Sequence, residues 1–199
     1  MKFINDYYNS IHSKSLKSYA TLVDWPSKKR QAKEFKIITS YLKLNKNYSL
    51  SDYGCGTGDL IKFLKKKPKI YYGYDINNKF IKICKKRFPG KKYFFYNSSK
   101  IRKKTDFIVA CGALSVKGKL KENIFSKKLF TILNNIIKCT TISFSANFHW
   151  DICPQKKRRD YLFYTNINEI KYFLNSKGIK NYIIKKNKEK FMFYLFASL

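Results

Sequence analysis

Three glycines at alternate positions follow a short β-prone run in the segment YSLSDYGCGTGD, residues 48–59. They are Gly54, Gly56 and Gly58, and an apolar-rich run over residues 60–64 comes next. Glycine lets a backbone turn sharply and approach a ligand where any side chain would clash. The turn also leads into a helix N-terminus, whose free N–H groups are hydrogen-bond donors. The segment therefore predicts a strand, a ligand-binding turn and a helix in succession.

A carboxylate stands at the end of the next predicted strand. The run Ile70–Tyr74 is followed by Asp75, which lies 21 residues after Gly54 (75 − 54). In a nucleotide-binding βαβ unit, an acidic side chain about 20 residues beyond the first glycine binds the ribose. Asp75 could instead be an N-cap for the helix expected from Asn78. Its place at the carboxyl end of a strand, where doubly wound sheets bind ligands, favours the ribose role.

Charge around the turn indicates which nucleoside it suits. A dinucleotide fingerprint places its third glycine at position 59, where this chain has Asp59. A carboxylate there repels a pyrophosphate but tolerates a zwitterionic or cationic ligand. Asp52, just before the turn, adds a second negative charge. Two carboxylates around a glycine turn suit a ligand that carries an ammonium and a sulfonium group.

On these residues the chain resembles class I S-adenosylmethionine-dependent methyltransferases, because DYGCGTGD is similar to the first motif of that superfamily. The resemblance implies S-adenosylmethionine as cofactor and S-adenosylhomocysteine as product, and it covers about residues 23–199. The segments VDWPSKKRQ, GYDIN and ACGALSV also resemble a group of small bacterial members with unassigned acceptors. Members of that group tend to carry an arginine just before the position of Phe35. This chain has Glu34 there, with Arg30 one helical turn earlier.

Strand-like and helix-like runs alternate along the chain, after a helix that we expect from Ser27 to about Leu44. Alternation of this kind predicts a doubly wound α/β fold, with a mostly parallel sheet and helices on both faces. The resemblance implies the Rossmann-like methyltransferase fold, with seven strands of which the last is antiparallel. The strands are expected at 49–53, 70–74, 92–96, 106–110, 140–144, 182–185 and 191–197, and further helices at 60–66, 78–88, 121–138 and 168–176.

Length and composition limit the class of protein. At 199 residues the chain is one domain by length, and 44% hydrophobic residues with 18% aromatics exclude a disordered chain. We divide it into an N-terminal lid or helical segment, residues 1–22, and a cofactor-binding domain, residues 23–199. There is no apolar run of about 18 residues and no secretory signal, so we expect a cytoplasmic protein without membrane contact. Five cysteines without C-x-x-C spacing are expected to be reduced thiols, and the sequence requires no metal.

The formal net charge of +31 has two interpretations. Dense lysine neutralises phosphates and is typical of nucleic-acid-binding proteins. However, the chain is equally rich in Asn, Ile, Tyr and Phe, which are all encoded by A/T-rich codons, and its lysines are spread over the whole length. We therefore favour compositional bias, with RNA as a possible partner.

The cofactor site is predicted from the ends of the first four strands. Each side chain also has a plainer structural interpretation: Asp52 could cap the local turn, Asp59 could be a first-turn carboxylate favoured by the helix dipole, and Asn97 could belong to an ordinary Asn-Ser turn. We expect a small buried thiol at Cys111, because the surroundings of a nucleophilic cysteine are missing. The predicted cofactor-binding residues are Asp52, Gly54, Cys55, Gly56, Gly58, Asp59, Asp75, Ile76, Asn97, Ser98, Cys111 and Gly112.

The acceptor is expected near the end of the fifth strand, in the segment SANFHWD. His149 is the candidate general base, because histidine has a suitable pKa for removing a proton at neutral pH. Alternatively it is a hydrogen-bonded histidine in an apolar lid. The basic run 156–159 could bind an anionic acceptor or RNA, although a charge run is usually a solvated face. The predicted pocket residues are Tyr19, Trp25, Leu114, Phe148 and Trp150.

The sequence thus predicts an enzyme that transfers a methyl group from S-adenosylmethionine to a small-molecule acceptor by in-line displacement. Two alternatives stay open: an RNA (rRNA or tRNA) methyltransferase that uses the basic surface, and a nucleoside-binding module without catalysis. The acceptor atom and the oligomeric state do not follow from the sequence.

Overall fold

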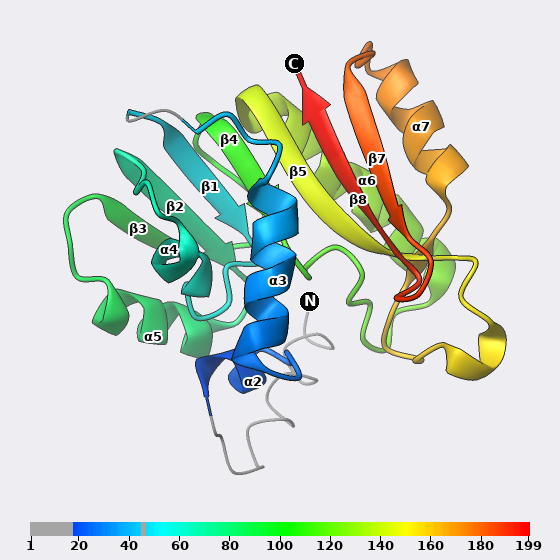
Figure 1. Ribbon diagram of the computed structural model, residues 1–199, viewed down its shortest axis with the longest axis horizontal. Helices are drawn as coiled ribbons and strands as arrows, with labels where there is room; N and C mark the ends of the chain where they lie inside the picture. Colours follow the sequence, from blue (N-terminus) through cyan, green and yellow to red (C-terminus); the bar gives the residue numbers. More distant parts are fainter. Residues whose placement is uncertain (1–17, 45–46) are drawn as a thin grey trace.

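The computed structural model describes residues 18–44 and 47–199 (Figure 1). The predicted N-terminal segment 1–22 therefore lies mostly outside the described residues. The helices are α2 Tyr19–Leu22, α3 Lys28–Thr39, α4 Asp59–Phe63, α5 Asn78–Arg87, α6 Glu122–Cys139 and α7 Ile167–Ser176, with a 3₁₀ turn at Gln155–Lys157. The strands are β1 Ser49–Tyr53, β2 Ile70–Asp75, β3 Tyr93–Asn97, β4 Thr105–Ala110, β5 Thr140–Trp150, β6 Tyr164–Thr165, β7 Tyr182–Asn187 and β8 Met192–Ser198.

The strands form one sheet in the order β3-β2-β1-β4-β5-β8-β7. The pairs among β1 to β5 are parallel, whereas β8 runs antiparallel to both β5 and β7. This confirms the predicted α/β fold with an antiparallel last strand. The two-residue strand β6, which adds to the end of β5, was not predicted, because so short a run has no periodicity to read. The strand order reverses between β1 and β4, which is where doubly wound sheets bind ligands.

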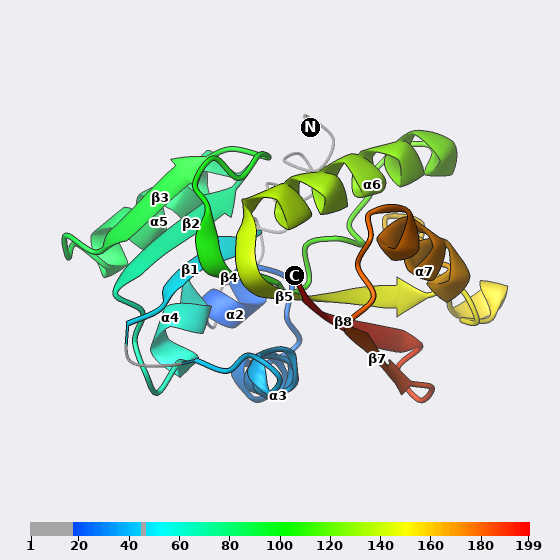
Figure 2. The ribbon, with the colours of Figure 1, turned by 90° about the horizontal axis from the view of Figure 1, so that it is seen from above.

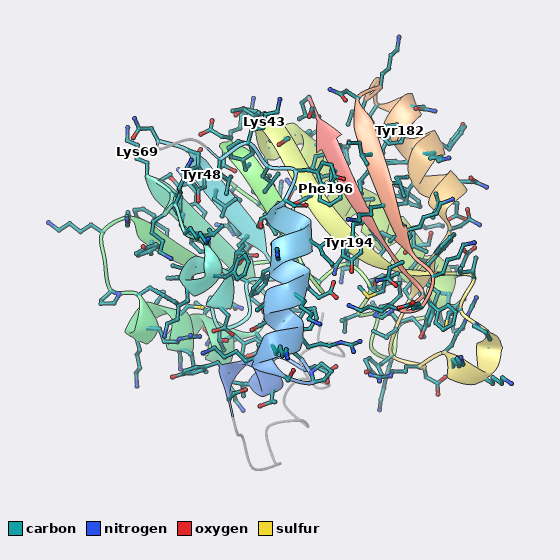
Figure 3. The ribbon with its side chains drawn as sticks, viewed as in Figure 1. Lys43, Tyr48, Lys69, Tyr182, Tyr194 and Phe196 are labelled. Atoms are coloured by element: carbon teal, nitrogen blue, oxygen red, sulfur yellow. The ribbon has the colours of Figure 1, made fainter. Side chains whose placement is uncertain are left out.

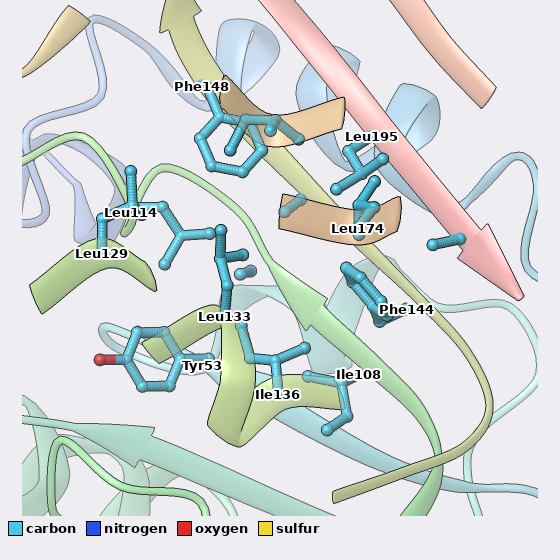
Figure 4. Packing of buried hydrophobic residues seen from close by; sticks show 14 of the residues in the cluster. Tyr53, Ile108, Leu114, Leu129, Leu133, Ile136, Phe144, Phe148, Leu174 and Leu195 are labelled. Atoms are coloured by element: carbon cyan, nitrogen blue, oxygen red, sulfur yellow. The ribbon is translucent and has the colours of Figure 1, made fainter. Parts of the chain in front are cut away.

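Helices cover both faces of the sheet. Figure 2 shows α3 and α4 on one side and α6 and α7 on the other. The first face is filled by apolar side chains of α3, α4 and α5 with those of β1, β2 and β4. On the second face, Leu129, Leu133 and Ile136 of α6 pack against Ile108 and Phe144 of the sheet (Figure 4). These leucines and isoleucines follow the helical repeat, so burial of one face stabilises α6.

Strand β5 extends to Trp150, well beyond the predicted end at residue 144. It is held over this length by antiparallel pairing with β8, from Ser143–Ser198 to His149–Met192. Alternation along a strand then places Asn147 and His149 on one face. The correction matters because it turns the predicted loop around His149 into part of a rigid element.

Helix α3 packs against the sheet beside β5 and β8 (Figure 1). Tyr194 points from β8 toward α3 (Figure 3), and its hydroxyl donates to the Glu34 carboxylate at 2.7 Å. The rings of Phe196 in β8 and Tyr41, which follows α3, lie 4.3 Å apart. Side-chain oxygens cap α2, α3, α5 and α7; in α3 and α5, Ser27 accepts from the Arg30 amide and Asn77 accepts from the Lys79 amide. No helix within residues 18–44 and 47–199 is long and apolar enough to cross a membrane.

Candidate functional site

A cavity of about 640 Å³ opens at the carboxyl ends of the parallel strands. Its walls come from the connection before α3, the glycine turn, the ends of β2, β4 and β5, the segment 153–164 and the β7–β8 hairpin. Predicted residues that line it are Trp25, Asp52, Gly54, Cys55, Gly56, Asp75, Ile76, Ser98, Cys111, Gly112, Phe148 and His149. The fold therefore brings most of the predicted site together in one space.

The glycine turn leaves no room for side chains. Gly54, Gly56 and Gly58 have φ angles of 73°, 52° and 78°, in the left-handed region that glycine adopts without strain. A Cβ atom at Gly54 would lie 2.2 Å from the Ala113 Cβ, and one at Gly56 would lie 2.8 Å from the Val23 Cγ1. The turn is fixed to the neighbouring strand, because the Gly54 amide donates to the Tyr74 carbonyl at 2.7 Å. Close backbone approach of this kind is what a nucleoside-binding turn requires.

Asp75 lies beside this turn. Its Oδ2 accepts from the Gly56 amide at 2.9 Å, and its Oδ1 accepts from the Asn77 amide at 2.8 Å. Burial raises the pKa of Asp75 to about 6, although the hydrogen bonds from the backbone amides act to lower it. Asn77, and not Asp75, caps α5, because its side chain accepts from the Lys79 and Phe80 amides. Each oxygen of Asp75 has further lone pairs for a ligand hydroxyl at the cavity wall.

Asp52 is 3% exposed and accepts a hydrogen bond from the Tyr71 hydroxyl at 2.6 Å. Burial raises its pKa to about 7, with smaller contributions from the charges of Asp75 and Asp59. The bond from Tyr71 opposes this rise. A buried carboxylate without a cationic partner is costly, so a ligand ammonium placed beside it would be stabilised.

Asp59 and Gly58 lie outside the cavity, although both were predicted to bind the cofactor. Asp59 forms an ion pair with Arg87, with Nη2 and Oδ1 2.7 Å apart, and accepts from the Thr57 hydroxyl at 3.0 Å. It faces a second cavity of about 660 Å³ between α2, α3 and α4. Gly58 is the residue before α4, where its positive φ starts the helix. The two residues build the turn instead of lining the pocket.

Four further predicted residues also lie elsewhere. Asn97 does not line the cavity, because its amide donates to the Ile76 carbonyl at 2.8 Å and so ties β3 to the end of β2. Tyr19 lies under the Arg87 guanidinium, 3.8 Å from the ring centroid, at the second cavity. Leu114 and Trp150 are buried in the apolar cluster beneath α6. The pocket prediction failed for them because hydrophobicity does not distinguish a pocket wall from a core.

His149 lines the far end of the cavity, at the end of β5. Burial lowers its pKa to about 4, and the Arg159 cation lowers it further, whereas Glu34 opposes both effects. Its ring centroid lies 5.6 Å from that of Tyr164, and its backbone amide donates to the Ser115 hydroxyl at 3.0 Å. The imidazole is therefore neutral near pH 7, and its lowered pKa makes it a weaker base than an ordinary histidine.

Sequence reasoning missed four buried polar residues of the cavity: Gln31, Glu34, Ser115 and Asn147. Asn147 accepts from the Gly112 amide at 2.7 Å and so holds the turn after β4. Glu34 is 1% exposed, and besides Tyr194 it binds the Lys190 Nζ at 2.8 Å. Asn147 could have been found from its two-residue spacing to His149, had β5 been extended. Glu34 carried no such signal, because its partners are about 160 positions away.

Within residues 18–44 and 47–199, no three His, Cys, Asp or Glu side chains come together in a way that could hold a metal ion. All five cysteines are free thiols: Cys55, Cys84, Cys111, Cys139 and Cys153.

Comparison with known proteins gives the same fold. Residues 51–116 match the family described as methyltransferase domain. The magnesium protoporphyrin IX methyltransferase of Synechocystis PCC 6803, with bound S-adenosylmethionine, aligns with a TM-score of 0.65 at 14% identity over 99% of this chain and 95% of that one. The N-methyltransferase NodS of Bradyrhizobium japonicum WM9, in complex with S-adenosylhomocysteine, aligns at 0.66 and 13% over 96% and 97%.

A third structure, an S-adenosylmethionine-dependent methyltransferase from Aquifex aeolicus, aligns with a TM-score of 0.62 at 17% identity over 93% of this chain and 99% of that one. Among curated protein sequences, none matches this chain. The predicted resemblance is thereby confirmed: residues 51–116 match a methyltransferase domain family, and the chain has the fold of class I S-adenosylmethionine-dependent methyltransferases.

Proposed function

We propose that this protein transfers the methyl group of S-adenosylmethionine to a small-molecule acceptor. The observation that carries the proposal is one continuous cavity, which joins the glycine turn and Asp75 at one end to His149 at the other. A space of about 640 Å³ is in the range of small-molecule sites, and it is walled by segments from both ends of the chain. Both reactants would be enclosed together, away from water.

The residues at the first end fit the cofactor. The glycine turn, which has no side chains, would let the cofactor approach the backbone. Asp75 would accept hydrogen bonds from the ribose hydroxyls, and Asp52 would bind the amino group. Two carboxylates also complement the positive charge of a sulfonium ligand. When bound, S-adenosylmethionine supplies a methyl group on a sulfonium that is already an activated leaving group.

The residues at the second end would orient the acceptor. Trp25 covers Gly112 closely, since a Cβ at Gly112 would lie 3.1 Å from its Cζ2, and with Phe148 it forms an apolar wall. His149 lies at this end and is neutral at physiological pH, but its lowered pKa makes it a weak base, so its main contribution would be a hydrogen bond to the acceptor. Alignment and exclusion of water are the main contributions that such a site makes.

An RNA acceptor is the second candidate, and the net charge of +31 is the observation that favours it. The cavity of about 640 Å³ supports a small molecule instead, because an RNA would also have to place the nucleotides next to its target at the mouth of the cavity. Of the structures compared, one is named for magnesium protoporphyrin IX, which is a small molecule.

The proposal is tested by calorimetry with S-adenosylhomocysteine, followed by turnover with methyl-labelled S-adenosylmethionine and extract fractions of metabolites, RNA or protein. We expect binding by the wild type, an affinity loss of about tenfold or more for Asp75→Ala, and label in the metabolite fraction. Glu169→Ala, on the exposed side of α7, is the matched control. Absence of binding would refute the cofactor assignment, and label in RNA would replace the small-molecule acceptor. Binding without any S-adenosylhomocysteine formed would leave a nucleoside-binding module.

A further inference from the structure

The basic run 156–159 lies in the segment that closes the second end of the cavity, and its four members have different surroundings. Arg158 builds the segment, since its Nε donates to the Cys153 carbonyl at 3.0 Å and its Nη2 donates to the Asp151 carbonyl. Lys156 is exposed and lines no part of the cavity. Lys157 and Arg159 both line it. If the whole run lay on a solvated face, its four side chains would have similar surroundings.

Lys157 and Arg159 are exposed residues of the cavity wall, which places them at its mouth. The Lys157 Nζ lies 5.2 Å from the centroid of the Phe191 ring, on the β7–β8 hairpin. The Arg159 Nη1 donates to the hydroxyl of Tyr161 at 2.8 Å. This bond uses one of the five N–H donors of the guanidinium. Neither side chain forms an ion pair within 4.0 Å in the described part of the chain, where the pairs are Arg87–Asp59 and Lys190–Glu34.

Other charged groups share this end of the cavity. Lys190 is neutralised by Glu34, and Lys128 and Glu189 also lie along the wall. Asp24 also lines the cavity, and its carboxylate is one of the charges that raise the pKa of Arg159, after the hydrogen bond to Tyr161. Asp24 is therefore close enough to Arg159 to compete with an incoming anion.

Carboxylates of Asp52 and Asp75 lie at the cofactor end, whereas Lys157 and Arg159 lie at the end that holds His149. We propose that Lys157 and Arg159 form a subsite for an anionic group, a carboxylate or a phosphate, on the small-molecule acceptor. An anion held there would direct the rest of the acceptor inward, past His149 and toward the glycine turn. This inference rests on the proposed function and narrows its substrate class.

The subsite is tested by calorimetric titration of phenyl phosphate, benzoate and neutral phenol into protein saturated with S-adenosylhomocysteine. We expect both anions to bind and phenol not to, and the relative affinities of phenyl phosphate and benzoate tell a phosphate subsite from a carboxylate subsite. The double variant K157Q/R159Q should lose at least tenfold in anion affinity, while the control K156Q, which removes one charge from the same run, should change it less than twofold. D24N should bind the anions about threefold more tightly, because the competing carboxylate is removed. Asparagine tolerates the positive φ of 65° at this position.

Two results would overturn the subsite while leaving the cofactor site intact: S-adenosylhomocysteine binds but neither anion does, or K156Q and K157Q/R159Q lose affinity equally. A third is a short RNA that displaces phenyl phosphate and whose own affinity falls equally in all lysine variants, since this would assign the run to a polynucleotide. Failure of S-adenosylhomocysteine itself to bind would overturn the proposed function, and the subsite with it. The gain in D24N is a readout that an unfolded variant cannot imitate.

Discussion

The three aspartates around the glycine turn look alike in the sequence but have different environments. Asp59 is paired with Arg87, Asp75 accepts from two backbone amides, and Asp52 has a single hydrogen bond from Tyr71. Burial raises the pKa of Asp52 and Asp75, to about 7 and about 6. The negative charge of Asp59 is balanced by the Arg87 guanidinium and needs no cationic ligand. A carboxylate that is buried but lacks a cation is therefore the better sign of a cationic ligand than a carboxylate near the motif.

Asp52 should make stability depend on pH. Its folded pKa of about 7 lies above the unfolded value of 3.8, so its contribution is complete below about pH 4 and is lost as pH rises through about 7. Asp52→Asn removes this loss. We expect the free energy of unfolding of the variant, relative to the wild type, to increase with pH by at most about 1.4 kcal/mol per unit in this window. Urea unfolding without cofactor measures it, and parallel curves for the two proteins would contradict the buried, cation-free environment.

Gly54 tests how tightly the turn is packed. Gly54→Ala forces alanine into a φ of 73° and places its Cβ 2.2 Å from the Ala113 Cβ. Gly178→Ala has a matching φ of 72° but no atom within 4 Å of the new Cβ. We expect a loss of about 1–2 kcal/mol at Gly178 from backbone strain alone, and about 1–3 kcal/mol more at Gly54 from overpacking. Thermal unfolding of the two variants gives the difference, and equal losses would mean that the turn has room to relax.

At the scale of elements, α5 is joined to the glycine turn at its C-terminal end. Arg87, the last residue of α5, binds Asp59 and also donates to the Thr57 carbonyl inside the turn. The Cys84 thiol, one helical turn earlier, donates to the Gly56 carbonyl at 3.1 Å. Helix α5, which follows β2, therefore stabilises the glycine turn that follows β1. These contacts join the two βα units of the site.

The Arg87–Asp59 pair can be measured by a double-mutant cycle. The two side chains are 9% and 16% exposed, so removal of either one leaves a largely buried charge. We expect Arg87→Ala to lower the free energy of unfolding by about 3 kcal/mol, and the coupling to Asp59→Ala to be about 1–3 kcal/mol. Lys86→Ala, at the exposed neighbouring position, should change stability by less than about 0.5 kcal/mol. Additive losses in the cycle would show that the pair contributes only through packing.

For the whole molecule, the dominant electrostatic feature is self-repulsion. The chain has 43 basic and 12 acidic residues, and the described part contains two ion pairs. Most of the positive charge is therefore screened only by water and salt, which disfavours a compact state. This holds whether or not the charge also serves a partner.

Added salt should accordingly stabilise the protein. Raising sodium chloride from about 0.05 to about 0.5 M shortens the screening length severalfold and weakens the repulsion between exposed lysines. We expect the melting temperature to rise by several degrees, with a plateau once screening is complete. Scanning calorimetry across this range is the measurement. A falling melting temperature would mean that attractive surface pairs outweigh the repulsion.

Local pattern was enough to predict the framework. The alternation of β-prone and amphipathic runs, the glycine turn and the position of Asp75 predicted the sheet and the meeting of the turn with Asp75 at its edge. These succeed because strands of a parallel sheet end at one edge, so that residues following separate strands must meet there. The same reasoning ended β5 at residue 144, because its extension depends on pairing with β8, which lies 50 positions further along the chain.

What only the tertiary structure decided is which side chains face the cavity. The sequence cannot show that Asp59 turns to Arg87, that Leu114 and Trp150 join the core, or that Glu34 is neutralised by Lys190, because each choice depends on a partner from another element. The division of the run 156–159 into cavity-lining and outward-facing members has the same origin. Hydrophobic periodicity and glycine stereochemistry act over a few residues and can be read from the chain. Charge pairing and burial depend on what the completed fold brings within a few ångströms.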